Sequence, residues 1–271
     1  MYRRNRILVL VDFSENSKNL IDFSVGLSET LNAKVMFIHQ VPGIVPGMTD
    51  FESRHKIIEA EKNDAREKLY EITPDRFKND QHFLISEKNI ITILNELKTE
   101  NYDDWVLAGL KGTGFLKRLF IGSTTLSIVD KSDSLTIAVP VKEKITLPTK
   151  LAIGVNKKFP LNKTQFETVL SGLKEQISEI KFFTILEEND DKTEAEIYLE
   201  QIKEEYKSFN TTSELLNGDT YTRLVDSVGK NNDTFLLLQQ GSRSLQDSIF
   251  RKFMINELVY NGDTPLIVLS S

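Results

Sequence analysis

Residues 106–124 read VLAGLKGTGFLKRLFIGST. The apolar run that opens this stretch is typical of a buried parallel strand, and it ends at Gly109. Gly112 lies in the loop that follows, and residues 122–124 (GST) precede a helical pattern. Glycine lets the backbone adopt positive φ or approach a ligand closely, and the free amides of a helix start favour an anion. The stretch therefore predicts a strand, a phosphate-binding loop and a helix.

A second informative stretch is residues 6–14 (RILVLVDFS), an apolar run that ends in Asp12. The run predicts a strand buried on both faces. An acid at the carboxyl end of a central strand lies at the crevice where open α/β sheets bind ligands. The alternative interpretation of Asp12 is a capping acid before the helix expected over residues 17–31, and the two roles can coexist.

These two stretches together resemble the universal stress protein family. Gly109, Gly112, Gly122 and Ser123 match its nucleotide-binding signature G-x2-G-x9-G-[S/T], and residues 10–14 are similar to its P-V-D-x-S, with leucine in place of proline. The resemblance implies that the first half binds ATP. The site residues that it implies are Val11, Asp12, Ser14, Gln40, Val41, Ala108, Gly109, Gly112, Gly122, Ser123 and Thr124. A Mg²⁺ between the phosphates would take oxygens from Ser123 or Asp12 together with waters.

The same order of elements occurs twice along the chain. Strands are expected at 7–11, 34–39, 82–86, 105–109 and 135–139, with helices at 17–31, 51–72, 89–100 and 123–131. After a proline-bounded linker, strands are expected at 150–156, 180–186, 212–216, 234–238 and 265–269, with helices at 163–177, 192–209, 221–228 and 244–258. Alternating β and α elements predict an α/β fold of two tandem doubly wound domains, 1–147 and 148–271, each with an open five-stranded parallel sheet flanked by helices. Such an architecture resembles a tandem, adenine-nucleotide-binding member of the same family.

The second half differs from the first at the expected site. Asn156 stands where the first half has Asp12, and residues 251–253 (RKF) stand where it has Gly122 and Ser123. Nucleotide binding in the second half is therefore not expected. The last strand of each half is expected to lie at a sheet edge, where open backbone groups attract another strand. The two halves can pair through these edges as an intramolecular pseudo-dimer, and a homodimer of whole chains is left open.

Composition excludes several classes of protein. The chain has 271 residues and a net charge of −6, which argues against nucleic-acid or anionic-membrane partners. It has no cysteine and only three histidines, so neither a disulfide framework nor a zinc site is expected. No apolar stretch approaches the roughly 18 residues of a membrane span. The basic start leads into a strand too short for a signal peptide, so a cytoplasmic protein is expected.

Three functions remain compatible with the sequence. The first is an ATP-binding stress-response or regulatory module, the second an adaptor that has kept the fold, and the third an enzyme that consumes ATP. A Walker A sequence is absent, and the first strand is followed by DFSENS rather than by a glycine-rich loop. The family resemblance implies slow ATP hydrolysis at most. His39 is a candidate general base by location alone, and a histidine of the core or rim is the alternative.

Overall fold

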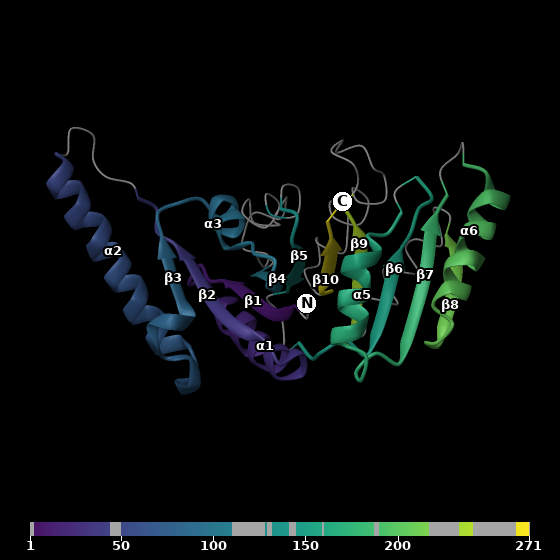
Figure 1. Ribbon diagram of the computed structural model, residues 1–271, viewed down its shortest axis with the longest axis horizontal. Coiled ribbons are helices and arrows are strands. Elements are labelled where there is room, and N and C mark those ends of the chain that lie inside the picture. Colours follow the sequence, from purple (N-terminus) through teal and green to yellow (C-terminus); the bar gives the residue numbers. More distant parts are fainter. Residues whose placement is uncertain are drawn as a thin grey trace.

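The computed structural model describes residues 3–43, 50–109, 128, 132–140, 145–158, 160–186, 190–216, 233–240 and 264–270. Ten strands form one sheet in the order β3-β2-β1-β4-β5-β10-β9-β6-β7-β8 (Figure 1). Their bounds are β1 Arg4–Leu10, β2 Lys34–Gln40, β3 Phe83–Ser86, β4 Tyr102–Gly109, β5 Leu135–Val139, β6 Lys150–Gly154, β7 Glu179–Ile185, β8 Thr211–Leu216, β9 Thr234–Gln239 and β10 Leu266–Leu269. Each half contributes five parallel strands in the same relative order, so the predicted fold class is confirmed.

Five α-helices lie within the described residues. They are α1 Ser17–Leu31, α2 Phe51–Ile72, α3 Ile90–Leu97, α5 Lys163–Gly172 and α6 Lys192–Glu205. Asp50, Asn89, Asn162 and Asp191 start the last four, because each side chain accepts a backbone N–H of the first turn. Asn32 ends α1 in a left-handed conformation. The first two helices have the predicted bounds, whereas α3, α5 and α6 end earlier than predicted. Of the helix expected at 123–131 the structure describes only Ile128, which is helical, and the helices expected at 221–228 and 244–258 lie outside the described residues.

Side chains of β1 show why the sheet is covered on both faces. Ile7 and Val9 belong to a core that also contains buried side chains of α1, α5 and α6. Leu8 points the other way, into a second core with Ile93 of α3 and Ile128. Because successive strand residues face opposite sides, a run of apolar residues with no polar alternation requires helices on both faces.

The two halves meet where β5 pairs with β10. This pairing is antiparallel, with Ile137 opposite Ile267, whereas every other neighbouring pair in the sheet is parallel. The sheets of the two halves are therefore continuous. The core is continuous too, because Phe23 of α1 stacks on Phe235 of β9 with ring centroids 5.9 Å apart. At the outer ends of the sheet, α2 lies beside β3 and α6 beside β8 (Figure 1).

Helices α1 and α5 contact each other over this junction. A Cβ on Gly172, the last residue of α5, would lie 2.6 Å from Leu31 Cδ2 and 3.2 Å from Trp105 Cζ2. The Trp105 ring is fully buried, so it has little freedom to move away. The glycine therefore permits the close approach of the second half to the first. Among the helices that the structure describes, none is both long and apolar enough to cross a membrane.

We expect Gly172→Val to lower the free energy of unfolding by about 1–3 kcal/mol, because the added side chain overpacks the junction between the halves. Gly26→Ala is the control, since no atom lies within 4 Å of the new Cβ in α1. Alanine is the better helix former by about 1 kcal/mol, so this variant should be as stable as the parent or more so. Urea unfolding measures both, and equal stability of Gly172→Val and the parent would contradict the close junction.

Candidate functional site

The loop after β1 forms a tight turn around Asp12. Its Oδ1 accepts hydrogen bonds from the Ser14 backbone N–H at 3.0 Å and from the Ser17 hydroxyl at 3.3 Å. Phe13 takes φ +56°, a left-handed conformation that costs a residue other than glycine about 1–3 kcal/mol. The Asp12 residue is nevertheless exposed. Asp12 thus holds the turn together, and the residue is exposed just beyond the end of β1.

His39, at the end of β2, is held by this same loop. Its Nδ1 lies 2.7 Å from the Val11 carbonyl oxygen, which can only accept, so Nδ1 donates. The imidazole packs on the Phe13 ring with centroids 4.4 Å apart, and the Lys68 ammonium of α2 lies 5.8 Å from that ring centroid. His39 is therefore half-buried, and the orientation of its ring is fixed by the Val11 carbonyl just after β1.

The backbone at the ends of the first three strands continues the sheet beyond the strands themselves. The Val11 N–H donates to the Ile38 carbonyl and the Val41 N–H donates to the Ser86 carbonyl, both at 2.9 Å. Val41 is buried, whereas the neighbouring Gln40 is exposed. The strand end expected to line a base thus presents one buried and one exposed residue.

Asn16, which the sequence did not single out, links this loop to the ends of β4 and β5. It is 3 % exposed, and its Nδ2 donates to the Val139 carbonyl at 3.0 Å. A Cβ on Gly109 would lie 2.6 Å from the same Nδ2 atom. Ala108, just before Gly109, is buried in β4. The first glycine of the predicted signature is therefore required by close packing of the Asn16 amide.

The structure brings several of the predicted residues to one edge. Val11, Asp12 and Ser14 follow β1, Gln40 and Val41 lie at the end of β2, and Ala108 and Gly109 end β4. Since β1 pairs with β4 on one side and with β2 on the other, this edge is the switch point of the first sheet. Gly112, Gly122, Ser123 and Thr124 lie outside the described residues. Within the described part of the chain, no three carboxylate or histidine residues gather to hold a metal ion.

The second half repeats the backbone geometry of this edge. Asn156 Oδ1 accepts the Lys158 N–H at 2.8 Å, as Asp12 accepts the N–H two residues on. The Val155 N–H donates to the Phe183 carbonyl at 2.8 Å, and the Thr184 hydroxyl donates to the Val155 carbonyl, as His39 does to Val11. The same turn thus forms with an amide in place of the carboxylate.

The two halves differ at the end of the fourth strand. Gln239 ends β9 opposite Leu269, which is the register position of Gly109 opposite Val139. The Gln239 amide donates to the Ser270 carbonyl at 2.7 Å, and its Oε1 accepts the Asn162 N–H at 2.7 Å. A hydrogen-bonded side chain therefore covers the strand end that is bare of a side chain in the first half.

A double-mutant cycle tests the packing of Asn16 on Gly109. We expect Gly109→Ala to destabilise the protein by about 1–3 kcal/mol, because its Cβ collides with the buried amide. Asn16→Ala should cost a similar amount by leaving the Val139 carbonyl without that donor. The double variant should cost less than the sum, since the shortened side chain makes room for the methyl group. Additive losses in urea unfolding would show that the two residues do not interact.

The chain is similar to known proteins in both sequence and fold. A model of the "Universal stress protein family" matches residues 3–140. A universal stress protein from Archaeoglobus fulgidus DSM 4304 has a similar structure over 99 % of both chains, with 17 % identity and a TM-score of 0.66. A functionally unknown protein from Pseudomonas aeruginosa PAO1 is similar over 98 % of this chain and 92 % of its own, with 9 % identity and a TM-score of 0.62.

A third similar structure is a domain of a cotransporter. The cytoplasmic domain of a prokaryotic cation chloride cotransporter is similar over 98 % of this chain and 95 % of its own, with 12 % identity and a TM-score of 0.52. No curated protein sequence matches the chain. The structural likenesses establish the fold, and the sequence match over residues 3–140 establishes the family. The chain belongs to the universal stress protein family.

Proposed function

We propose that the protein is a cytoplasmic stress-response or regulatory module that binds ATP at one site, in its first half. The supporting observation is the contrast between the two switch points. Asp12 and the bare backbone of Gly109 flank the first, whereas Asn156 and the side chain of Gln239 flank the second. Ligands of open α/β sheets bind at such switch points, where phosphates need unobstructed backbone and helix-start amides.

The predicted signature supports the same assignment. Gly109 ends β4 at the crevice, and Gly112, Gly122 and Ser123 follow it in the chain with the spacing of the family motif. In this proposal the glycine loop would hold the phosphates, Asp12 the ribose hydroxyls or the waters of a Mg²⁺, and the strand end at Gln40 and Val41 the adenine. Ser123 would be a further oxygen ligand of the Mg²⁺.

The hydrogen bonds that Asp12 makes in the turn favour a regulatory rather than a metabolic role. Asp12 Oδ1 is already engaged in the turn, and the residues of the predicted signature are glycines and a serine rather than general bases. The fold also occurs in the cytoplasmic domain of a cotransporter, where it is part of a larger system. An adaptor that has lost the ligand is the alternative, and the absence of bound nucleotide in freshly purified protein would favour it.

Calorimetric titration of the full chain with ATP and Mg²⁺ should give a stoichiometry near one per chain, because only the first half has the open strand end. Mass spectrometry of ligand released from the purified protein is the companion measurement and should detect an adenine nucleotide. A stoichiometry of two equal sites would contradict the contrast between Gly109 and Gln239.

Asp12→Asn isolates the charge of Asp12, since Asn156 shows that an asparagine supports the same turn. We expect ATP binding to become less favourable by about 1–3 kcal/mol, because the variant loses a hydrogen bond to a charged group. The matched control is Asn156→Asp, which makes the reverse change in the second half and should leave the ATP affinity unaltered. An unchanged dissociation constant for Asp12→Asn would restrict Asp12 to its role in the turn.

A further inference from the structure

The second half keeps a pocket beside the edge that corresponds to the proposed ATP site. Its volume is about 320 Å³, and it lies between the ends of β6 and β7 and the first turns of α6. Small-molecule sites commonly have volumes of about 300–1,000 Å³, so the pocket suits a compact ligand. The Gln239 side chain fills the neighbouring strand end in this half. Among the described residues, the strand end that is bare of a side chain in the first half is therefore occupied in the second.

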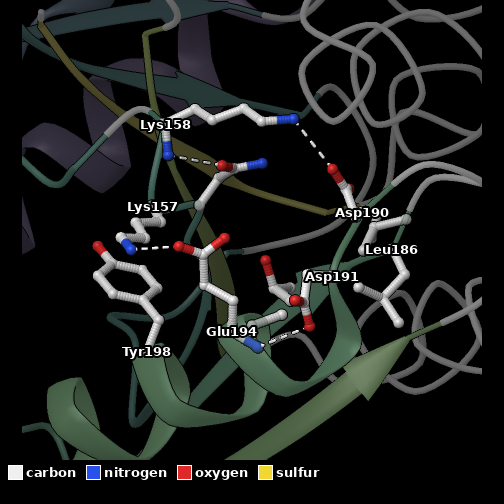
Figure 2. A pocket seen from close by; sticks show the side chains of 11 residues that line it. Lys157, Lys158, Leu186, Asp190, Asp191, Glu194 and Tyr198 are labelled. Carbon is white, nitrogen blue, oxygen red and sulfur yellow. Dashed lines mark hydrogen bonds and ion pairs between the residues drawn. The ribbon is translucent and has the colours of Figure 1, made fainter.

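Two ion pairs cross this pocket. Lys157 bonds to Glu194, and Lys158 Nζ lies 2.9 Å from Asp190 Oδ1 (Figure 2). Both lysines come from the turn after β6, and both carboxylates come from α6 or the residues before it. Both side chains of the Lys157–Glu194 pair are more than half exposed, and such a pair contributes about 0–1 kcal/mol. A ligand that replaces one partner of a pair therefore meets little resistance.

The charges argue against two classes of ligand. Asp191 caps α6 and accepts the N–H groups of Thr193 and Glu194, so the helix-start amides already hold a carboxylate and do not attract a phosphate. The lining carries three carboxylates against two lysines, which further disfavours a polyanion. A divalent cation is disfavoured as well, because the described residues contain no metal-binding group of three.

The lysines, the carboxylates and the apolar side chains of the pocket are complementary to a molecule that carries one positive and one negative charge. An ammonium group can replace a lysine beside Glu194 or Asp190, and a carboxylate can replace an acid beside Lys157 or Lys158, so no charge is left unpaired. Ile185, Leu186 and Ala195 provide an apolar wall, and the Tyr198 ring lies beside Lys157 (Figure 2).

We infer that the pocket at Lys157 and Glu194 binds a free α-amino acid with an apolar side chain. Its carboxylate bonds to the lysines after β6, its ammonium to the carboxylates of α6, and its side chain contacts the apolar wall. The site is separate from the ATP site proposed for the first half, and it makes the second half a sensor domain of its own. No residue of the proposed ATP site takes part.

The test is calorimetric titration of the full chain with L-leucine and with L-phenylalanine. Isocaproate, which is leucine without the ammonium, and isoamylamine, which is leucine without the carboxylate, are the matched probes. We expect at least one of the two amino acids to bind. Each leucine analogue should bind at least about tenfold more weakly than that amino acid. Binding of neither amino acid at millimolar concentration, or equal binding of isocaproate, would overturn the inference.

Variants locate the site and separate it from the ATP site. Glu194→Gln and Lys157→Gln should each weaken amino-acid binding about tenfold, because each removes one charge that the ligand pairs with. The control Glu196→Gln lies on the same helix and pairs with Lys192, so it should leave binding unchanged. Both site variants alter exposed side chains and should fold, which circular dichroism checks. ATP should not compete with the amino acid; competition, or full affinity in Glu194→Gln, would overturn the assignment.

Discussion

The antiparallel pairing of β5 with β10 is the interaction on which the arrangement of the two halves depends. Each half ends its parallel sheet with a fully buried apolar strand, and such a strand cannot remain an open edge in water. Pairing the two ends satisfies both edges at once and makes one continuous sheet of ten strands. The antiparallel direction relates the halves by an approximate twofold. Packing of Gly172 against Leu31 and Trp105 follows from that geometry, because it brings α5 against α1.

The repeat reaches the level of single hydrogen bonds at the ends of the first and second strands of each half. The turn after the first strand forms around Asp12 and Asn156 alike, with the same bond to the residue two positions on. Asn16 and Asn162 both donate from Nδ2 to a carbonyl at or just beyond the last strand of their half. The end of the fourth strand is different, with glycine in one half and Gln239 in the other. The two halves therefore share the turn and the asparagine contact, and they differ at the end of the fourth strand.

Much of the fold follows from the sequence, because apolar runs and capping residues are local signals. Helices over residues 17–31 and 51–72 agree with the prediction, since Asn32 and Pro74 mark their ends. Helix α5 ends at Gly172, earlier than its pattern indicates, and Gly172 packs closely against Leu31 and Trp105 of the first half. The roles of Asn16 and Gln239 depend on contacts between distant segments, which spacing cannot reveal. An asparagine before the first helix of each half was the available signal.

We propose that only one of the two similar halves holds the nucleotide. Amide hydrogen exchange of the full chain, with and without ATP and Mg²⁺, tests it most directly, because exchange reports each backbone segment separately. We expect ATP to slow exchange in residues 11–17, in residues 40–43 and in the segment after Gly109. Exchange in residues 155–158 and 184–186 should be unchanged. Equal protection of the corresponding segments in both halves, or protection confined to the second half, would contradict ATP binding by the first half alone.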